Sequence, residues 1–138
     1  MRLIVSTAVL GEDAGMSFEI RTARTFSAAH QLRLYDGSLE PLHGHNWRVE
    51  VTVAAAKLDS IGVVMDFHEL ERLIDQIIGP MHNAHLNELP AFADMNPSAE
   101  NVALHIAQSL RLPPAMRLTR VEVWETEENS AAWCDGGQ

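Results

Sequence analysis

A two-residue alternation between His43 and Val53 is the feature that most limits how this chain can fold. The segment reads HGHNWRVEVTV, so His43, His45, Trp47 and three valines share one face, and mainly polar residues occupy the other. Successive side chains of a β-strand point to opposite faces of the sheet. The segment therefore predicts a long half-buried strand, with both histidines on its apolar face.

Two further stretches alternate in the same way and predict partner strands. One runs from Met16 to Ala28 and the other from Thr119 to Glu125, and a closing strand is expected over residues 131–134. A turn at residues 35–38, Tyr-Asp-Gly-Ser, separates the first stretch from the histidine-containing one. The pattern predicts an α+β domain with a four-stranded antiparallel sheet.

Two helices are expected between these strands. The first begins after Asp66, whose carboxylate caps it while Glu69 completes the capping pair, and its apolar spacing ends at Gly79. The second has Asn96 as its N-cap and Pro97 in the first helical position. Both apolar stripes should pack on one face of the sheet. The open sheet edges and the uncovered face then favour association of copies into a closed ring.

Length and composition limit the classes of function. The 138 residues suit one domain, residues 16–138, preceded by an N-terminal extension over residues 1–15, for which an edge strand is the alternative. Acidic residues outnumber basic ones by 19 to 10, and the formal charge of −9 disfavours nucleic-acid binding. No apolar run approaches the ~20 residues of a membrane span, so no membrane partner is expected. The one cysteine, Cys134, cannot form an intramolecular disulfide, which suits a reducing cytoplasm.

His43 and His45 form the first candidate site. Residues two apart on a strand point the same way, so both imidazoles can reach one metal ion. His30 closes the preceding stretch, and a hairpin would bring it to the pair. Three histidines with an open fourth position are typical of a catalytic zinc. The alternative is a chance pair among seven histidines, of which His68 and His105 are expected on helices as solvated or packed residues.

Glu125 is the second candidate, because alternation places it on the apolar face of its strand. An unpaired carboxylate there would cost several kcal/mol, so it requires a partner. One alternative is an arginine of this chain, such as Arg24, Arg48 or Arg120. The other is a ligand with two parallel N–H donors, such as the edge of a guanidine or a 2-aminopyrimidinone, which a carboxylate accepts in a bidentate manner.

Short motifs in a fixed order connect these candidates with a known family. They are FSAAH (26–30), LHGH (42–45), VMDFHEL (64–70), LN (86–87), NPSAE (96–100) and VWET (123–126). With these motifs, from about Met16 to Trp133, the chain resembles the 6-pyruvoyl-tetrahydropterin synthase family. That family includes the 6-carboxy-tetrahydropterin synthases of the queuosine pathway.

The resemblance implies a fold, a cofactor and a substrate. The fold would be the tunnelling fold, in which trimers stack into hexamers with active sites between subunits. The Zn²⁺ ligands would be His30, His43 and His45. Glu125 would anchor the 2-amino and N3 hydrogens of a pterin, helped by Thr126 and by the start of the second helix around Ser98. The substrate would be 7,8-dihydroneopterin triphosphate, which loses triphosphate or a carbon fragment while protons are shuttled.

Two positions depart from the family's pattern. Typical members carry a cysteine base shortly before the His-Gly-His motif, whereas this chain has Glu40 three residues before it. The form Glu-x-x-His-Gly-His resembles a variant branch with aldolase-like activity, which yields 6-hydroxymethyl-7,8-dihydropterin for folate synthesis. A solvated loop glutamate is the alternative for Glu40. The usual Asp-His pair is replaced by His-Asn-Ala-His, in which His82 or His85 could carry a proton.

Two functions from different classes follow. The first is a zinc-dependent pterin lyase with Glu40 as base and His82 or His85 assisting. The second is a pterin- or purine-binding protein that keeps the metal site and Glu125 but has weak or no turnover. The match of the metal ligands and of Glu125 with the family favours the enzyme.

Overall fold

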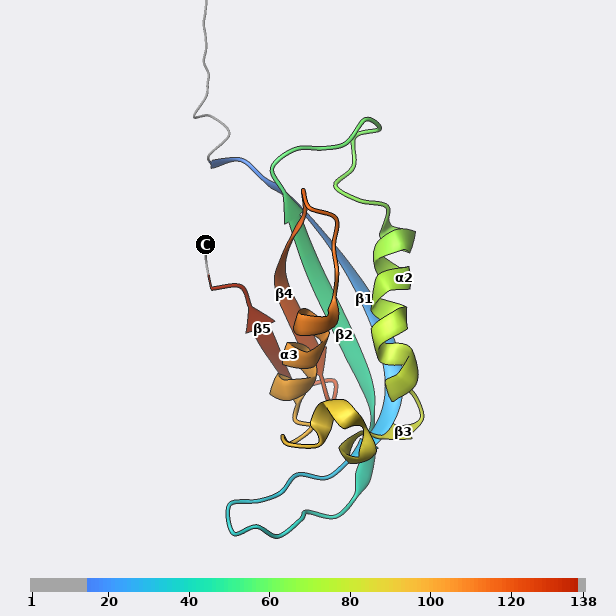
Figure 1. The fold of residues 1–138 in the computed structure, drawn as a ribbon, viewed down its shortest axis with the longest axis vertical. Helices are drawn as coiled ribbons and strands as arrows, with labels where there is room; N and C mark the ends of the chain where they lie inside the picture. Colours follow the sequence, from blue (N-terminus) through green and yellow to red (C-terminus); the bar gives the residue numbers. More distant parts are fainter. Residues whose placement is uncertain (1–14, 137–138) are drawn as a thin grey trace, which may run out of the picture.

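A long hairpin forms the centre of the protein (Figure 1). The computed structural model describes residues 15–136, so the expected N-terminal extension lies, up to residue 14, outside the described residues. The hairpin consists of β1 (Phe18–His30) and β2 (His43–Ala55), which pair in antiparallel fashion along their whole length. The last residue of β1 therefore lies directly opposite the first residue of β2.

The predicted alternation of β2 is confirmed by its burial. Trp47 and the valines at positions 49, 51 and 53 are fully buried, whereas Arg48 between them is exposed. One face of β2 thus belongs to the core. His43 and His45 share that face and lie where the core ends.

The sheet has five strands in the order β3-β1-β2-β4-β5. β4 (Arg117–Trp124) and β5 (Ser130–Cys134) confirm the two later strands within two residues of their predicted ends. The predicted count of four strands is wrong by one, because β3 (Ala84–His85) pairs in parallel with β1. Asn83 turns the chain at a left-handed φ of 58°, and its N–H donates to the Ser27 carbonyl. A two-residue strand is too short to show an alternation in the sequence.

Helix α2 (Phe67–Ile78) confirms the first predicted helix. The Asp66 carboxylate caps it by accepting a hydrogen bond from the His68 N–H at 2.8 Å. Glu69, expected to complete the capping pair, instead accepts two hydrogen bonds from Arg72, at 2.7 and 3.0 Å. A guanidinium one turn away is a charged donor and binds a carboxylate more strongly than a backbone N–H does.

Helix α3 (Ala99–Ser109) begins two residues later than predicted. Ser98 is its N-cap and accepts a hydrogen bond from the Asn101 N–H at 3.1 Å. The predicted cap at Asn96 is wrong, because the amide of that side chain binds both backbone groups of Arg33. Serine and asparagine cap helices about equally well, so this tertiary contact decides between them. The later start leaves the carbonyl of the intervening proline outside the helix.

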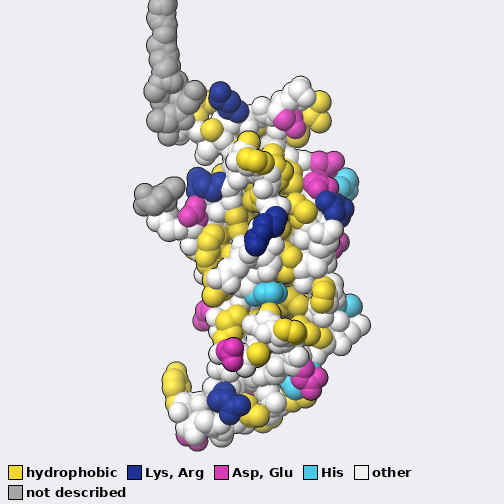
Figure 2. Space-filling view, viewed as in Figure 1, with side chains coloured by type: hydrophobic (Ala, Val, Ile, Leu, Met, Phe, Trp, Pro, Cys, Tyr) yellow, Lys and Arg dark blue, Asp and Glu magenta, His cyan; other side chains and the backbone are white. Residues whose placement is uncertain are grey.

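Both helices cover the same face of the sheet, as predicted (Figure 1). α2 packs against β1, and α3 packs against β4 and β5. The Arg24 guanidinium donates two hydrogen bonds to Asp75, both at 2.9 Å, and so ties β1 to α2. Neither of these helices is long and apolar enough to cross a bilayer. On the helix-covered side, charged side chains of both signs are scattered among hydrophobic ones (Figure 2).

Candidate functional site

Three histidine side chains meet where the β1–β2 hairpin leaves the core. His30 ends β1 opposite His43, and His45 follows two residues later on the same face of β2. Their ligand nitrogens all lie within 4.8 Å of one another. The predicted hairpin therefore brings His30 to the His43–His45 pair, as expected.

Backbone carbonyls orient two of these rings. Nδ1 of His30 lies 2.8 Å from the carbonyl oxygen of Pro97, and Nδ1 of His43 lies 2.9 Å from that of Pro41. A carbonyl only accepts hydrogen bonds, so each Nδ1 carries the proton and each Nε2 keeps a lone pair. The Nε2 atoms of His30 and His45 are buried and have no hydrogen-bond partner in the described part of the chain. Together with Nε2 of His43, these two nitrogens fit a zinc ion, which would satisfy the two buried lone pairs.

The surroundings of His45 favour its neutral form. Burial lowers the pKa of His45, the rings of His30 and His43 lower it further, and the carboxylates of Glu125 and Glu40 partly oppose this effect. Only a neutral imidazole binds a metal ion. The lowered pKa therefore keeps this ring in its ligand form at neutral pH.

Glu125 follows β4 directly and faces the histidine cluster. Its two carboxylate oxygens lie 3.7 Å from Nε2 of His30 and 3.9 Å from Nε2 of His45. No arginine within residues 15–136 pairs with Glu125, so the alternative of a partner such as Arg24, Arg48 or Arg120 is wrong. All three candidate arginines pair with other carboxylates: Arg24 with Asp75, Arg48 with Glu50 and Arg120 with Glu122. The Glu125 side chain is 28% exposed, so its carboxylate borders both the cluster and solvent.

Glu40 lies in the loop between β1 and β2 and turns back toward the end of β1. Its Oε1 accepts a hydrogen bond from the Leu32 N–H at 3.0 Å, and its own N–H donates to the Leu32 carbonyl at 3.0 Å. The residue is half-buried, and its charge acts on His45. The backbone of Leu32, two residues after His30, thus holds the carboxylate, whereas a solvated loop glutamate would have no such partner.

Thr126 and Ser98 shape the backbone on two sides of the cluster. The Thr126 hydroxyl accepts hydrogen bonds from the N–H groups of Glu128 and Asn129, at 3.2 and 3.1 Å, and so fixes the turn that follows Glu125. Ser98 caps α3 directly after the proline whose carbonyl orients His30. Both expected binding residues therefore follow directly on residues that contact the histidines, Glu125 and Pro97, and have structural partners of their own.

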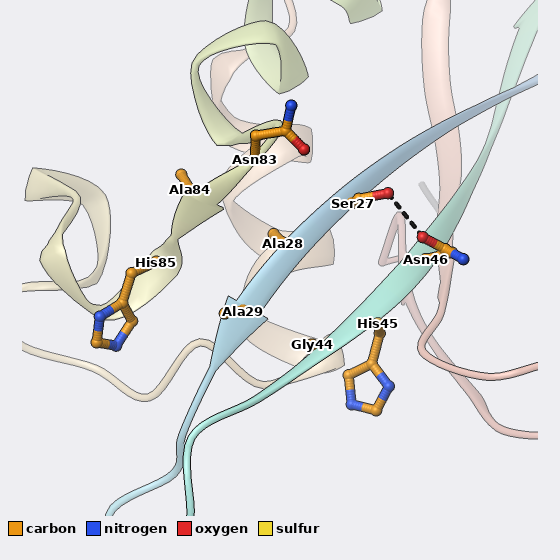
Figure 3. Close-up of a pocket in the computed structure, with 9 residues that line it drawn as sticks. All are labelled: Ser27, Ala28, Ala29, Gly44, His45, Asn46, Asn83, Ala84 and His85. Atoms are coloured by element: carbon orange, nitrogen blue, oxygen red, sulfur yellow. Dashed lines mark hydrogen bonds between the residues drawn. The ribbon is translucent and has the colours of Figure 1, made fainter.

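His82 and His85 lie at the other edge of β1. Figure 3 shows the imidazoles of His45 and His85 extending from strands on either side of β1, and a hollow of about 520 Å³ has both among its lining residues. Nδ1 of His82 accepts a hydrogen bond from the Ser27 N–H at 3.1 Å. Nδ1 of His85 lies 3.5 Å from Glu88, and its buried Nε2 has no hydrogen-bond partner within residues 15–136. In the described part of the chain, neither histidine belongs to the group formed by His30, His43 and His45, although His85 shares the hollow with His45.

Three further residues shape the site although the sequence assigned them no role in it. Pro41 and Pro97 supply the carbonyls that orient the histidines. Asn87 binds both backbone groups of Gln31, next to the end of β1. All three residues belong to the short motifs or lie next to one, and this position was the only sign in the sequence that they take part in the site. The backbone groups that they bind could not be identified from the sequence.

The fold and this cluster agree with one family of known proteins. A profile described as 6-pyruvoyl tetrahydropterin synthase matches residues 19–135. The chain belongs to this family. Among curated relatives of this family member, the dihydroneopterin monophosphate aldolase of Pyrococcus furiosus is 34% identical over 106 residues, which cover 75% of this chain and 86% of the relative. The 6-carboxy-5,6,7,8-tetrahydropterin synthase of Synechocystis is 32% identical over 114 residues, covering 79% and 87% of the two chains.

Solved structures of 6-pyruvoyl tetrahydropterin synthases share the fold of this family member. The Caenorhabditis elegans protein matches with a TM-score of 0.74 at 21% identity, covering 87% of this chain and 96% of that one. A Plasmodium vivax 6-pyruvoyltetrahydropterin synthase, whose catalytic glutamate is replaced by alanine, matches with a TM-score of 0.66 at 17% identity, covering 86% and 97%. These likenesses confirm the predicted α+β tunnelling fold.

Proposed function

We propose that this family member is a zinc-dependent lyase that acts on the side chain of a dihydropterin. The observation that carries this proposal is the convergence of three imidazoles and one carboxylate. The imidazole nitrogens lie within 4.8 Å of one another, and Glu125 lies 3.7 Å from Nε2 of His30. Packed histidines of a purely structural cluster would be expected to find protein partners, whereas two of these Nε2 atoms have none in the described residues.

His30, His43 and His45 are the residues that would hold the zinc ion. When bound, zinc supplies a Lewis acid that polarises a hydroxyl or carbonyl of the substrate side chain. The carbonyls of Pro97 and Pro41 keep two of the rings oriented for this task.

Glu125 is the residue that would bind the pterin ring. A pterin presents the 2-amino and N3 hydrogens side by side, and an ionised carboxylate can accept both. Thr126 fixes the turn after Glu125 and Ser98 caps α3 after Pro97, and from these positions they would shape the ends of the ring site. The bidentate contact would orient the ring and leave its side chain directed at the metal.

Glu40 is the proposed base. The Leu32 N–H holds its Oε1, and its other oxygen is the one that would take a proton from a hydroxyl of the substrate. His82 or His85 would carry protons further. Because both lie across β1 from the cluster of their own chain, we propose that they serve the site of a neighbouring copy. The protein would then act in the cytoplasm as a ring-shaped homo-oligomer, a trimer or hexamer.

The name of one relative and the catalytic residue of another protein of the family support cleavage of the side chain as the proposed reaction. The Pyrococcus furiosus relative is named an aldolase, and the Plasmodium vivax protein has a glutamate as its catalytic residue. We therefore propose that 7,8-dihydroneopterin triphosphate, or the corresponding monophosphate, is cleaved to 6-hydroxymethyl-7,8-dihydropterin. Formation of a 6-pyruvoyl- or 6-carboxy-tetrahydropterin is the alternative reaction within the family.

A binding protein with weak or no turnover is the second candidate. The observation that favours it is the placement of His82, whose Nδ1 is engaged by the backbone of Ser27. The usual Asp-His pair and cysteine base are also missing from the sequence around these positions. Such a protein would hold a metal ion and a pterin or purine without converting it.

Incubation of the zinc-loaded protein with 7,8-dihydroneopterin triphosphate, and separately with the monophosphate, tests the proposal. Products are identified by mass, and 6-hydroxymethyl-7,8-dihydropterin is expected. Glu40→Gln should lower turnover by roughly 10²-fold, the scale of a general base, with zinc content and pterin affinity close to those of the parent. Glu19→Gln, an exposed glutamate near the far end of β1, is the matched control. Parental turnover in Glu40→Gln would exclude this base, and no turnover in the loaded parent would favour the binding protein.

A further inference from the structure

Two asparagine side chains act as a substitute strand along the segment that follows β1. The Gln31 N–H donates to Oδ1 of Asn87 at 3.0 Å, and Nδ2 of Asn87 donates to the Gln31 carbonyl at 2.7 Å. Asn96 binds Arg33 in the same manner, at 2.8 and 3.0 Å. Each amide thus satisfies both backbone groups of one residue, as a neighbouring strand would.

Glu40 occupies the opposite edge of the same segment. Leu32, between the two clamped residues, donates its N–H to Oε1 of Glu40 and accepts the Glu40 N–H at its carbonyl, both at 3.0 Å. Neighbouring residues of an extended chain direct their backbone groups to opposite sides. The two amides on one side therefore direct the Leu32 N–H at the Glu40 carboxylate on the other.

We propose that Asn87 and Asn96 are positioning residues for Glu40. They hold residues 31–33 so that the Leu32 N–H fixes one oxygen of Glu40 and leaves the other to take up a proton. A primary amide suits this task because it donates and accepts in one plane, whereas a carboxylate only accepts. The proposal rests on the proposed function of Glu40 as base.

Asn96 and Pro97, at the start of α3, also connect this segment with the histidine cluster. Asn96 holds Arg33, and the next residue, Pro97, orients His30 through its carbonyl. The Asn96 carbonyl accepts a hydrogen bond from the Asn101 side-chain amide at 2.8 Å, which ties Asn96 to α3. The helix start thereby fixes both ends of the segment from His30 to Arg33, so its position is set by a rigid element rather than by the loop.

Asn96→Ala and Asn87→Ala test the proposal by separating kcat from KM. With zinc at saturation, each variant should lower kcat roughly tenfold or more, since small misplacements of a catalytic group are costly. KM and zinc content should remain near those of the parent. In a Glu40→Gln background, either change should alter the residual turnover by no more than about twofold, because the group that it positions is already lost. Gln76→Ala, an exposed amide on α2, is the matched control.

Hydrogen exchange provides a readout that does not depend on turnover. Backbone amides of residues 31–40 should exchange faster in Asn96→Ala and Asn87→Ala, but not in Gln76→Ala. Unchanged exchange would show that the amides do not hold the segment, and equal losses of kcat with and without Glu40 would show a merely structural role. If Glu40→Gln itself keeps parental turnover, or if the loaded parent has none, the proposed function fails and the positioning role with it. If Glu40→Gln is impaired while both asparagine variants keep kcat, only the positioning role fails.

Discussion

Replacement of Glu125 by glutamine distinguishes a pterin anchor from a structural partner of the histidines. The carboxylate oxygens lie 3.7 and 3.9 Å from the Nε2 atoms of His30 and His45, and the side chain is 28% exposed. Glutamine keeps the shape of the side chain but presents an NH₂ group in place of one acceptor oxygen. One hydrogen bond from the pterin edge is then lost, and the other is no longer assisted by charge.

The magnitude follows from these two changes. A hydrogen bond to a charged group contributes about 1.5–3 kcal/mol, so a total loss of about 3 kcal/mol is expected. This corresponds to roughly 10²-fold weaker pterin binding, because each 1.4 kcal/mol changes Kd about tenfold. The free energy of unfolding should change by less than about 0.5 kcal/mol, since the carboxylate borders solvent.

Calorimetric titration with 7,8-dihydroneopterin and a thermal unfolding curve together provide the assay. Glu127→Gln, an exposed glutamate two residues further along, is the matched control and should keep parental affinity. Unchanged affinity in Glu125→Gln, together with a clear loss of thermal stability, would refute the anchor and show that Glu125 supports the histidine cluster.

The remaining predictions concern the metal, the half-buried His105 and the link between sheet and helix. The double variant His43→Ala/His45→Ala should contain no stoichiometric zinc in elemental analysis, because one imidazole cannot compete with water, and retained zinc would contradict the three-histidine site. Burial lowers the pKa of His105 below the ordinary 6.5, so the unfolded chain takes up the proton first and stability falls as the pH drops below that value. His105→Gln should therefore weaken the fall in Tm between about pH 7 and about pH 5, and an unchanged slope would assign the effect to other groups. Arg24→Ala removes the ion pair with Asp75, in which the two side chains are 36% and 46% exposed. The free energy of unfolding measured in urea should fall by no more than about 1 kcal/mol, and pterin affinity should be unchanged.

The sequence predicted the parts of this structure in which a periodic pattern reflects burial. Alternation over residues 43–53 identified β2, and the 3.6-residue spacing after Asp66 identified α2. The same alternation placed His43 and His45 on one face, and the turn between the strands implied a hairpin that would add His30. These features depend on local geometry, and the spacing of apolar residues along the sequence reflects that geometry directly.

The features that the sequence did not reveal depend on contacts between distant segments. Asn96 was expected to cap a helix, but the backbone of Arg33, far away in the sequence, takes its amide. β3 exists because Asn83 reaches the edge of β1 at Ser27, and two residues carry no periodicity. Glu125 faces the histidines at the end of the apolar face, as the alternation predicted, but its strand ends one residue earlier and its carboxylate also borders solvent.

The hydrophobic core and the cluster of His30, His43 and His45 are in direct contact, and this determines which part of the site can change independently. The Trp47 ring lies 4.9 Å from the His30 ring and 5.5 Å from the His45 ring, and its indole N–H donates to the Ala28 carbonyl at 3.2 Å. His30 and His45 therefore pack against a fully buried aromatic side chain that is part of β2 and is hydrogen-bonded to β1. Glu40, in contrast, depends on a loop that two side-chain amides hold. Substitutions in that loop should alter turnover while the metal stays bound, whereas substitutions beneath the histidines should affect metal binding and folding together.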